Sequence, residues 1–559
     1  MTATAPADLV IRNARVFTAA AGDDRLYAGL AVTGGRITAV AAADAELDAH
    51  VGPGTTVHDL GGASVVPGLF DAHCHYNHGG MMVLRELVFP SHASLDEVLA
   101  AVDTFARDLP EGAWVSGGSW GSTLLPQLSS LAARARLDAV SHGHPVHLYD
   151  DSHHNAWVNT EGMRVSGMVV DGSGEYPEGT LQDPGTGELL GVLLERATDT
   201  VRTYLAQAQA PTPEEHLEFA RKGIEVLNSF GVTGIQDALI READLVTGHA
   251  LEEAGQLTLH ISSCLWNPGP GRPGHDVAAL EALADELGSD LLRTDFVKLA
   301  LDGVPPAQTA AFEEPYVPSQ QWGDHHCGHV TMDPAELVGV LRHNCENGRS
   351  TKIHCAGDAS VRAAIDGFEV MRREGFADVR FHIAHGQFVR PEDRVRMAEL
   401  DVVAEISPFL WYPNVIVSAI SEVLTEERTA RMHPNRELTD RGVLVAGGSD
   451  WPVEPLPNLW LGIAGLVTRA DPGGRFPGTL WSEEALTVPE ALRAFSLNGA
   501  VAARLDDEIG SLEVGKCADF VVIDRDPFAI EPAEIAGTRV LSTWFAGEVV
   551  YEAASVVPA

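Results

Sequence analysis

Two histidines separated by one residue are the first feature of this chain that could do chemistry. His73 and His75 follow the apolar run 65–70. In an extended strand, side chains alternate between the two faces, so these histidines point the same way and could bind one cation together. With 23 histidines in the chain, the pair could also be a coincidence. The spacing therefore indicates a metal site only if other strands supply further ligands.

Further residues of metal-site type stand at the ends of later predicted strands. They are Lys298, His354, His385 and Asp450. Histidines together with an aspartate suit zinc or a related divalent metal. We therefore predict a metal centre at the ends of these strands, with zinc or a related divalent ion as the expected metal.

The elements that must position these residues alternate between strand and helix. Thr212-Pro213-Glu214-Glu215 and Asp333-Pro334-Ala335-Glu336 are capping boxes with proline at the first helical position, and each predicted helix is followed by a strand. Counting strands along the chain yields eight, at 65–75, 232–237, 258–264, 296–301, 351–354, 380–385, 402–407 and 443–450. This pattern predicts an α/β fold, a (β/α)8 TIM barrel over residues 67–504 with its active site at the carboxyl ends of the strands.

Two further parts of the chain fall outside the barrel pattern. Residues 76–205 lie between the first and second strands and predict an inserted lobe, in a position where substrate lids occur. Residues 1–66 and 505–559 contain short β segments broken by turns. Because chain termini often lie close together, we expect both ends to form one composite β-sandwich domain.

Composition narrows the class of protein. The 559 residues include 45% hydrophobic and 21% charged side chains, which is typical of a globular protein. A formal charge of -41 repels nucleic acid and anionic membranes. The six cysteines form no C-x-x-C pair, and the sequence shows neither a secretion signal nor a long apolar run. We expect a cytoplasmic protein with no nucleic-acid or membrane partner.

Several motifs in these strands resemble those of the amidohydrolase superfamily, in particular the branch related to N-substituted formamide deformylase (amidohydrolase family 3). The residues that carry the resemblance are 67–75 (PGLFDAHCH), 298–303 (KLALDG), 354–358 (HCAGD), 383–385 (IAH) and 448–452 (GSDWP). Residues 510–522 resemble the closing β segment of the family, so the resemblance spans nearly the whole chain. These motifs are specific to the superfamily but not to one substrate.

The resemblance implies a role for each ligand. His73, His75 and Asp450 would hold one metal, and His354 and His385 a second, bridged by a carboxylated Lys298. An unmodified lysine is a cation and cannot bind a divalent ion, so the alternative is a structural or substrate-binding lysine beside a single metal. His154 matches a family histidine that could donate a hydrogen bond to the substrate carbonyl; the alternative is an ordinary surface histidine.

The expected activity is metal-dependent hydrolysis of a carbon-nitrogen bond in a small-molecule amide, such as an N-substituted formamide. Asp450 would act as general base and then general acid, unless it is a metal ligand alone. One rival activity is deamination of a ring or amidine-type substrate. From a different class, the rival is a non-catalytic metal-binding scaffold. A homodimer is the usual expectation for such an enzyme.

Three weaker features have competing interpretations. Asp358 could orient a ligand, but we expect it to cap the helix that begins there. The cluster His325-His326-Cys327-Gly328-His329 looks metal-like, yet it lies in a long loop that we expect to be solvated. Several aromatic residues could line a pocket, although we expect more of them in the core: Trp114, Trp120, Tyr149, Trp157, Phe409, Trp411, Tyr412 and Trp451.

Overall fold

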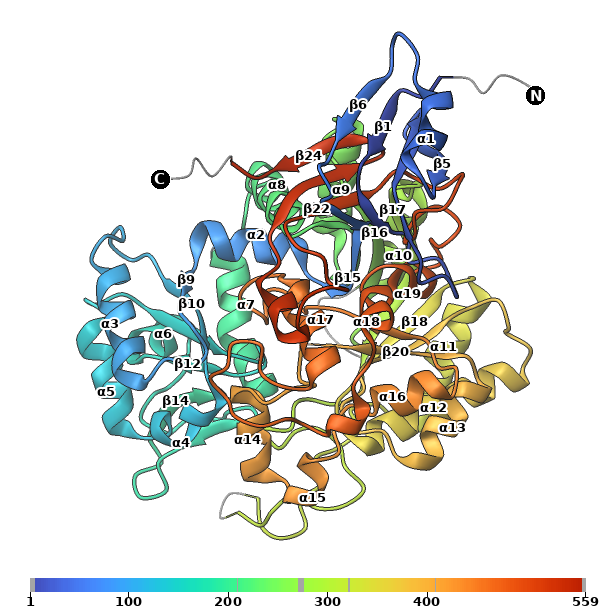
Figure 1. Cartoon of the computed structure of the whole chain (residues 1–559). Coiled ribbons are helices and arrows are strands. Elements are labelled where there is room, and N and C mark those ends of the chain that lie inside the picture. Colours follow the sequence, from blue (N-terminus) through green and yellow to red (C-terminus); the bar gives the residue numbers. More distant parts are fainter. Residues whose placement is uncertain (1–5, 209, 270–275, 320–321, 408, 555–559) are drawn as a thin grey trace.

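The centre of the molecule is an eight-stranded parallel sheet that curves into a barrel (Figure 1). The computed structural model describes residues 6–208, 210–269, 276–319, 322–407 and 409–554. In barrel order, the strands are β8 (Leu69–Cys74), β15 (Val232–Ile240), β16 (His260–Trp266), β17 (Leu292–Ala300), β18 (Ser350–Cys355), β19 (Phe381–His385), β20 (Val402–Ile406) and β21 (Val445–Gly447). The predicted TIM barrel is confirmed.

The barrel closes where its last strand meets its first. The backbone amide of Asp450 donates to His73 O at 2.7 Å, and that of His75 donates to Trp451 O at 2.9 Å. The Asp71 carboxylate accepts from the Ser449 amide at 2.9 Å. A Cβ on Gly448 would lie 2.5 Å from the His73 amide nitrogen, so only glycine allows this approach. The closure therefore places both ends of the predicted metal motif side by side.

Outer helices begin as their sequences predict. In α8 (Pro213–Ser229), the Thr212 hydroxyl accepts from the Glu215 amide at 3.2 Å, and the Glu215 carboxylate accepts from the Thr212 amide at 2.7 Å. A capping box also opens α11 (Pro334–Glu346). Other helices of the barrel are α9 (Glu242–Glu253), α10 (Val277–Leu287), α12 (Asp358–Arg373), α13 (Pro391–Glu399), α14 (Val415–Val423), α15 (Glu426–Thr429), α16 (Asn435–Asp440), α17 (Leu459–Thr468), α18 (Val488–Ala494) and α19 (Leu497–Ala502).

One helix start differs from the expectation. Asp358 is the first residue of α12, whose N-cap is Gly357, and no side chain caps this helix. The Asp358 carboxylate instead accepts from the Glu313 amide at 2.9 Å. The predicted cap is wrong because the carboxylate binds the long loop that follows β17 rather than its own helix.

Residues between β8 and β15 form a lobe with its own sheet, which lies to the left of the barrel in Figure 1. The strand order is β13 (Thr180–Gln182), β14 (Leu189–Leu193), β12 (Ala156–Val158), β11 (Val146–Asp150), β10 (Val115–Trp120) and β9 (Leu87–Val88). Its helices are α3 (Leu95–Ala106), α4 (Leu125–Leu128), α5 (Leu131–Val140), α6 (Thr160–Val165) and α7 (Asp199–Ala208), while α2 (Tyr76–Arg85) contacts α8 of the barrel. A separate hydrophobic core that includes Leu99, Leu148 and Trp157 stabilises the lobe.

The two ends of the chain share a sheet above the barrel in Figure 1. Its order is β24 (Glu548–Glu552), β23 (Val540–Phe545), β22 (Phe520–Ile523), β7 (Ser64–Pro67), β2 (Arg15–Phe17) and β3 (Leu26–Tyr27). A second sheet contains β5 (Arg36–Ala41), β4 (Gly29–Thr33), β1 (Leu9–Arg12) and β6 (Thr56–Asp59), beside α1 (Asp44–Leu47). Leu30 and Phe520 belong to a core that joins both sheets. The predicted domain boundaries stay predictions, and residues 1–5 and 555–559 of those ranges lie outside the described residues.

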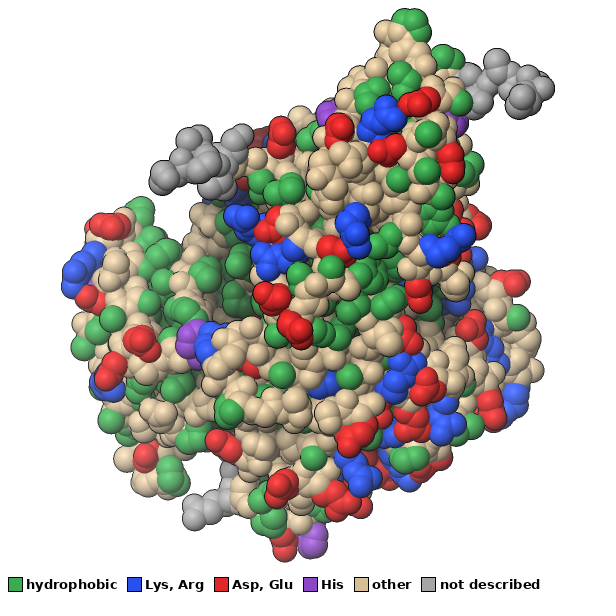
Figure 2. Space-filling view, in the orientation of Figure 1, with side chains coloured by type: hydrophobic (Ala, Val, Ile, Leu, Met, Phe, Trp, Pro, Cys, Tyr) green, Lys and Arg blue, Asp and Glu red, His purple; other side chains and the backbone are tan. Residues whose placement is uncertain are grey.

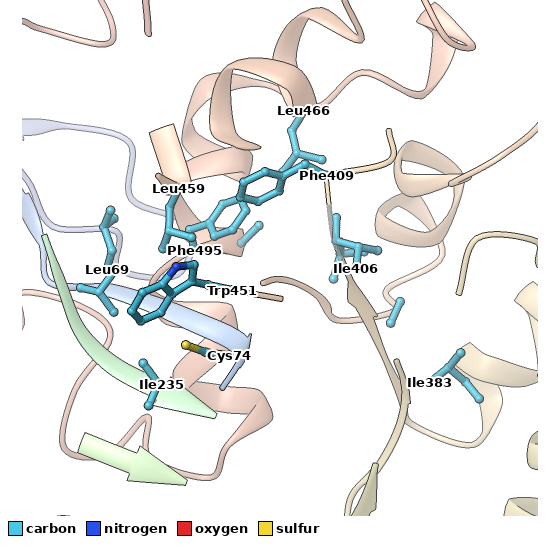
Figure 3. Packing of buried hydrophobic residues seen from close by; sticks show 14 of the residues in the cluster. Leu69, Cys74, Ile235, Ile383, Ile406, Phe409, Trp451, Leu459, Leu466 and Phe495 are labelled. Atoms are coloured by element: carbon cyan, nitrogen blue, oxygen red, sulfur yellow. The ribbon is translucent and has the colours of Figure 1, made fainter. Parts of the chain in front are cut away.

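Most of the aromatic residues named above belong to the core. Trp120, Trp157, Trp411 and Trp451 are at most 1% exposed. Figure 3 shows Trp451 beside Cys74, close to Leu459 and Phe495. A Cβ on Gly79 would lie 2.5 Å from the Trp451 ring, so α2 packs closely against this side chain. Within the described residues, no helix combines the length and apolar character needed to cross a bilayer.

Candidate metal centre and active site

Three predicted ligands converge at the carboxyl end of the barrel. Ligand atoms of His73, His385 and Asp450 all lie within 4.8 Å of one another, and the three side chains are buried. His73 Nε2 lies 3.4 Å from Asp450 Oδ1. The His73 and His385 rings have centroids 4.9 Å apart. Residues from the first, sixth and eighth strand positions thus form one cluster.

His75 and Lys298 lie beside the cluster of His73, His385 and Asp450. His75 Nε2 lies 3.2 Å from Asp450 Oδ1, and its side chain is 22% exposed. Lys298, on β17, has its Nζ atom 3.4 Å from His73 Nε2. Among the described residues, no carboxylate lies within ion-pair distance of the Lys298 amine. The predicted HxH pair and the lysine are therefore brought together with Asp450.

His354 stands on the lobe side of this cluster. Its ring centroid is 4.4 Å from that of His385, and its Nε2 lies 3.2 Å from Gly303 O. His154, from the loop between β11 and β12, has its ring centroid 5.4 Å from that of His354. His154 Nδ1 lies 2.9 Å from Glu195 Oε2. The lobe thus contributes a histidine to the site, and a carboxylate that no sequence motif had indicated orients that histidine.

A second carboxylate without a sequence motif of its own lies deeper in the barrel. Glu405 Oε1, on β20, is 2.8 Å from His73 Nδ1. Glu405 Oε2 forms an ion pair with Lys352 Nζ at 2.8 Å, and both side chains are fully buried. A signal for the pair was nevertheless present in the sequence: Glu405 and Lys352 are the only charged residues in their strands, Val402–Ile406 and Ser350–Cys355. A charge inside a barrel strand needs a partner in the interior.

Burial and neighbouring charges set the protonation states of the cluster. Burial, reinforced by the Lys298 ammonium, holds the pKa of His73 well below its ordinary value. Burial also lowers the pKa values of His354 and His385. For Asp450, burial acts in the opposite direction, but the neighbouring histidines hold its pKa well below the ordinary range. Neutral imidazoles beside an ionised carboxylate are the protonation states that metal binding requires.

Burial lowers the pKa of Lys298 to about 8, although Glu405 and Asp450 act against this shift. Burial alone would lower the pKa of His154, but the Glu195 carboxylate raises it above its ordinary value. In return, His154 and the Thr309 hydroxyl outweigh burial and lower the pKa of Glu195. His154 and Glu195 therefore form an ion pair at the edge of the site.

Three of these residues have a strained backbone conformation. His385 has φ 72°, Asp450 has φ 56° and Glu195 has φ 47°, all in the left-handed region that non-glycine residues seldom adopt. Such conformations persist only when the surrounding structure enforces them, and they are common at functional sites. His385 ends β19 and Asp450 lies three residues after β21, and the side chains of both face His73.

The histidine cluster at 325–329 does not join this centre. The His325 side chain is 90% exposed. His326 Nε2 lies 2.6 Å from Gln308 O, and its ring stacks on Trp322 with centroids 4.4 Å apart. Across the part of the chain that the structure describes, the group of potential metal ligands is the one formed by His73, His385 and Asp450. In this loop segment His325 and His329 are exposed, whereas His326, Cys327 and Gly328 are half-buried.

Comparison with protein families matches residues 56–551 to the Amidohydrolase family. The chain belongs to the amidohydrolase family. This amidohydrolase is 26% identical over 562 aligned residues to N-substituted formamide deformylase of Arthrobacter pascens, and the alignment covers 98% of both chains. It is 27% identical to Protein LONG AFTER FAR-RED 3 of Arabidopsis thaliana, over 98% of this chain and 92% of the relative.

A solved structure shows the same fold. The amidohydrolase superposes on an uncharacterized metal-dependent hydrolase from Pyrococcus horikoshii OT3 with a TM-score of 0.72, at 22% identity, covering 94% of this chain and 99% of that chain. The family assignment makes the protein a metal-dependent hydrolase that acts on carbon-nitrogen bonds. The family assignment also implies a divalent metal. The clustered residues fit such an ion for two reasons: their ligand atoms converge, and the imidazole of His73 is neutral while the Asp450 carboxylate is ionised.

Proposed function

We propose that this amidohydrolase cleaves the amide bond of a small N-substituted formamide, or of a similar amide with an apolar or aromatic substituent. The observation that carries the proposal is the convergence of His73, His385 and Asp450 within 4.8 Å. The full-length similarity to N-substituted formamide deformylase supports the substrate class. The proposed ion is zinc, which suits a ligand set of imidazoles and a carboxylate.

A divalent metal held by these residues would lower the pKa of a water molecule and polarise the amide carbonyl. The remaining steps belong to the chain. Asp450, ionised and beside His73 and His75, accepts the proton of the attacking water and later donates it to the departing amine. His154, held by Glu195, donates a hydrogen bond to the carbonyl oxygen from the lobe side. We propose these two residues as the catalytic pair.

We also propose that Lys298 is carboxylated. Only the neutral amine reacts with CO2, and a pKa of about 8 leaves roughly one-tenth of this amine neutral at pH 7. Its Nζ atom lies 3.4 Å from His73 Nε2, so a carbamate formed there would supply oxygen atoms beside this predicted ligand. Supporting this assignment, the buried amine has no carboxylate partner among the described residues.

Purified protein should be analysed for bound metal and then assayed with a panel of N-substituted formamides that carry benzyl, phenyl and alkyl groups. We expect zinc or another divalent metal in the preparation and release of formate with the corresponding amine. A chelator should abolish turnover, and added zinc should restore it. Ammonia released from ring or amidine substrates, with the formamides left intact, would overturn the deformylase proposal in favour of a deaminase.

A further inference from the structure

Glu405 lies behind the metal-binding edge of His73. The two ring nitrogens of a histidine face different directions, and here Nδ1 is 2.8 Å from Glu405 Oε1 whereas Nε2 is 3.4 Å from both Asp450 Oδ1 and Lys298 Nζ. An ionised carboxylate can only accept hydrogen bonds, so it requires the proton of His73 on Nδ1. The lone pair then lies on Nε2, which faces the ligand cluster.

The same carboxylate reaches His385 through one hydroxyl group. Ser407 Oγ donates to Glu405 Oε1 at 3.1 Å and lies 3.1 Å from His385 Nδ1. His385 Nδ1 is also 3.1 Å from the Ser407 carbonyl oxygen, which can only accept. These contacts place a proton on Nδ1 of His385 as well and leave Nε2 with its lone pair.

Lys352 keeps Glu405 ionised and fixes its orientation. Its Nζ atom lies 2.8 Å from Glu405 Oε2 and donates to Ala72 O at 2.6 Å. Ala72 immediately precedes His73, so the lysine joins the carboxylate to the strand that carries the ligand. Lys352 and Glu405 are each 0% exposed, and a buried charge pair of this kind is stable only with good geometry on both sides.

From these contacts we infer that Glu405, held by Lys352, is the positioning residue that sets the tautomer and orientation of two metal-binding histidines, His73 directly and His385 through Ser407. The inference rests on the proposed metal centre. Carboxylates that hold the non-ligating nitrogen of a histidine raise metal affinity, and their loss typically costs about 10- to 100-fold. Glu405 itself contacts no substrate atom in this assignment.

The test is the zinc affinity of the metal-free full chain, measured by competition with a chelator. In Glu405→Gln, an amide group must face either His73 or the Lys352 ammonium with a donor, so we expect zinc affinity to fall by about 10- to 100-fold. Ser407→Ala should lower it by about 2- to 10-fold, since the hydroxyl contacts to Glu405 and His385 are both lost while the Ser407 carbonyl still accepts from His385. Asp393→Asn is the matched control, because Asp393 is also 0% exposed and pairs with Arg362 at 2.8 Å on the outer helices. This control should leave zinc affinity within about twofold.

The outcomes separate the inference from the proposed function. Failure of the wild type to bind zinc, cobalt or manganese overturns the metal centre, and the positioning role with it. Wild-type zinc binding with undiminished affinity in Glu405→Gln overturns the positioning role alone. Should Glu405→Gln fail to fold, Ser407→Ala decides, and unchanged zinc affinity in that variant rejects the network.

The double variant Lys352→Met with Glu405→Gln tests the role of Lys352. It keeps a hydrogen-bond acceptor for His73 but removes the buried ammonium, so it should bind zinc more tightly than Glu405→Gln. Equal or weaker zinc binding rejects the role of Lys352.

Discussion

At the scale of single residues, the site depends on which protons are absent. His73, His354 and His385 are buried and hold depressed pKa values, so their imidazoles stay neutral and available as ligands. Asp450 stays ionised, with His75 Nε2 3.2 Å from its Oδ1 atom. The chemistry proposed for this enzyme therefore follows from burial combined with one carboxylate rather than from any unusual residue.

Replacement of Asp450 by asparagine separates its two proposed roles. Asparagine keeps one oxygen that can bind a metal but cannot accept the water proton, so we expect kcat to fall by about 10²- to 10⁴-fold. Steady-state turnover and metal content should be measured on the same preparation. Turnover near the wild-type level would reject Asp450 as the general base. Loss of turnover in parallel with loss of metal would assign it as a ligand alone.

For Lys298, the decisive variable is bicarbonate. If the amine forms a carbamate, reconstitution of metal-free protein with zinc should bind more metal when bicarbonate is present than when CO2 is excluded. The variant Lys298→Met has no amine, so its zinc content should be lower and insensitive to bicarbonate. A ¹³C signal from labelled bicarbonate in the wild type and not in the variant would provide direct evidence. Equal zinc content with and without bicarbonate in the wild type contradicts carboxylation.

At the scale of elements, the site forms where the barrel closes. The segment after β21 contacts the end of β8 through backbone hydrogen bonds between 450–451 and 73–75. The ligands of the first and last strands therefore depend on the same backbone contacts that complete the barrel. A small change in this closure should alter both stability and metal binding.

Gly448→Ala tests this coupling. Its Cβ would lie 2.5 Å from the His73 amide nitrogen and 2.6 Å from the His73 Cβ, so the two strands must separate. We expect the free energy of unfolding to fall by about 1–3 kcal/mol, with weaker zinc binding. Gly339→Ala is the control: it lies inside α11 with nothing within 4 Å of the new Cβ, and it should be neutral or stabilising by up to about 1 kcal/mol. Denaturant unfolding of metal-free protein measures both, and equal behaviour of the two variants would contradict the closure argument.

At the scale of the whole molecule, charge is distributed rather than concentrated. The chain carries -41 formal charges, yet on the face shown in Figure 2 acidic and basic side chains are interspersed. The expected homodimer and the cytoplasmic setting stay predictions. Whole-molecule stability should instead respond to pH through buried histidines, because these must stay neutral in the folded state.

His382 provides the clearest case of this pH dependence. Burial, with Lys352 nearby, lowers its pKa from 6.5 to about 3, and its Nε2 lies 3.2 Å from Ala502 O. Below pH 6.5 His382 binds a proton in the unfolded chain, whereas in the folded state it binds one only near pH 3. The contribution of His382 to the free energy of unfolding therefore falls as the pH falls through this window. In metal-free protein, the stability advantage of wild type over His382→Gln should therefore shrink by about 1–2 kcal/mol from pH 7 to pH 5. Parallel pH curves for His382→Gln and wild type would reject the assignment.

The sequence by itself determined the order of the barrel strands and the strand ends at which the candidate ligands lie. Period-two alternation, capping boxes and the position of charged residues after apolar runs are local signals, so His73, Lys298, His385 and Asp450 are identifiable as candidate ligands from the sequence alone. The helix start at Asp358 was predicted wrongly because its carboxylate binds a backbone amide of a distant loop.

Only the tertiary structure decided which groups hold these ligands. Glu405 lies 332 positions from its partner His73, and Glu195 lies 41 positions from His154. Such pairs depend on the register and tilt of the barrel strands and on how the lobe packs against the barrel. None of these features produces a pattern in the local sequence. The physical reason is that a strand pattern specifies which face a side chain lies on, whereas the partner across the interior is set by the packing of all eight strands together.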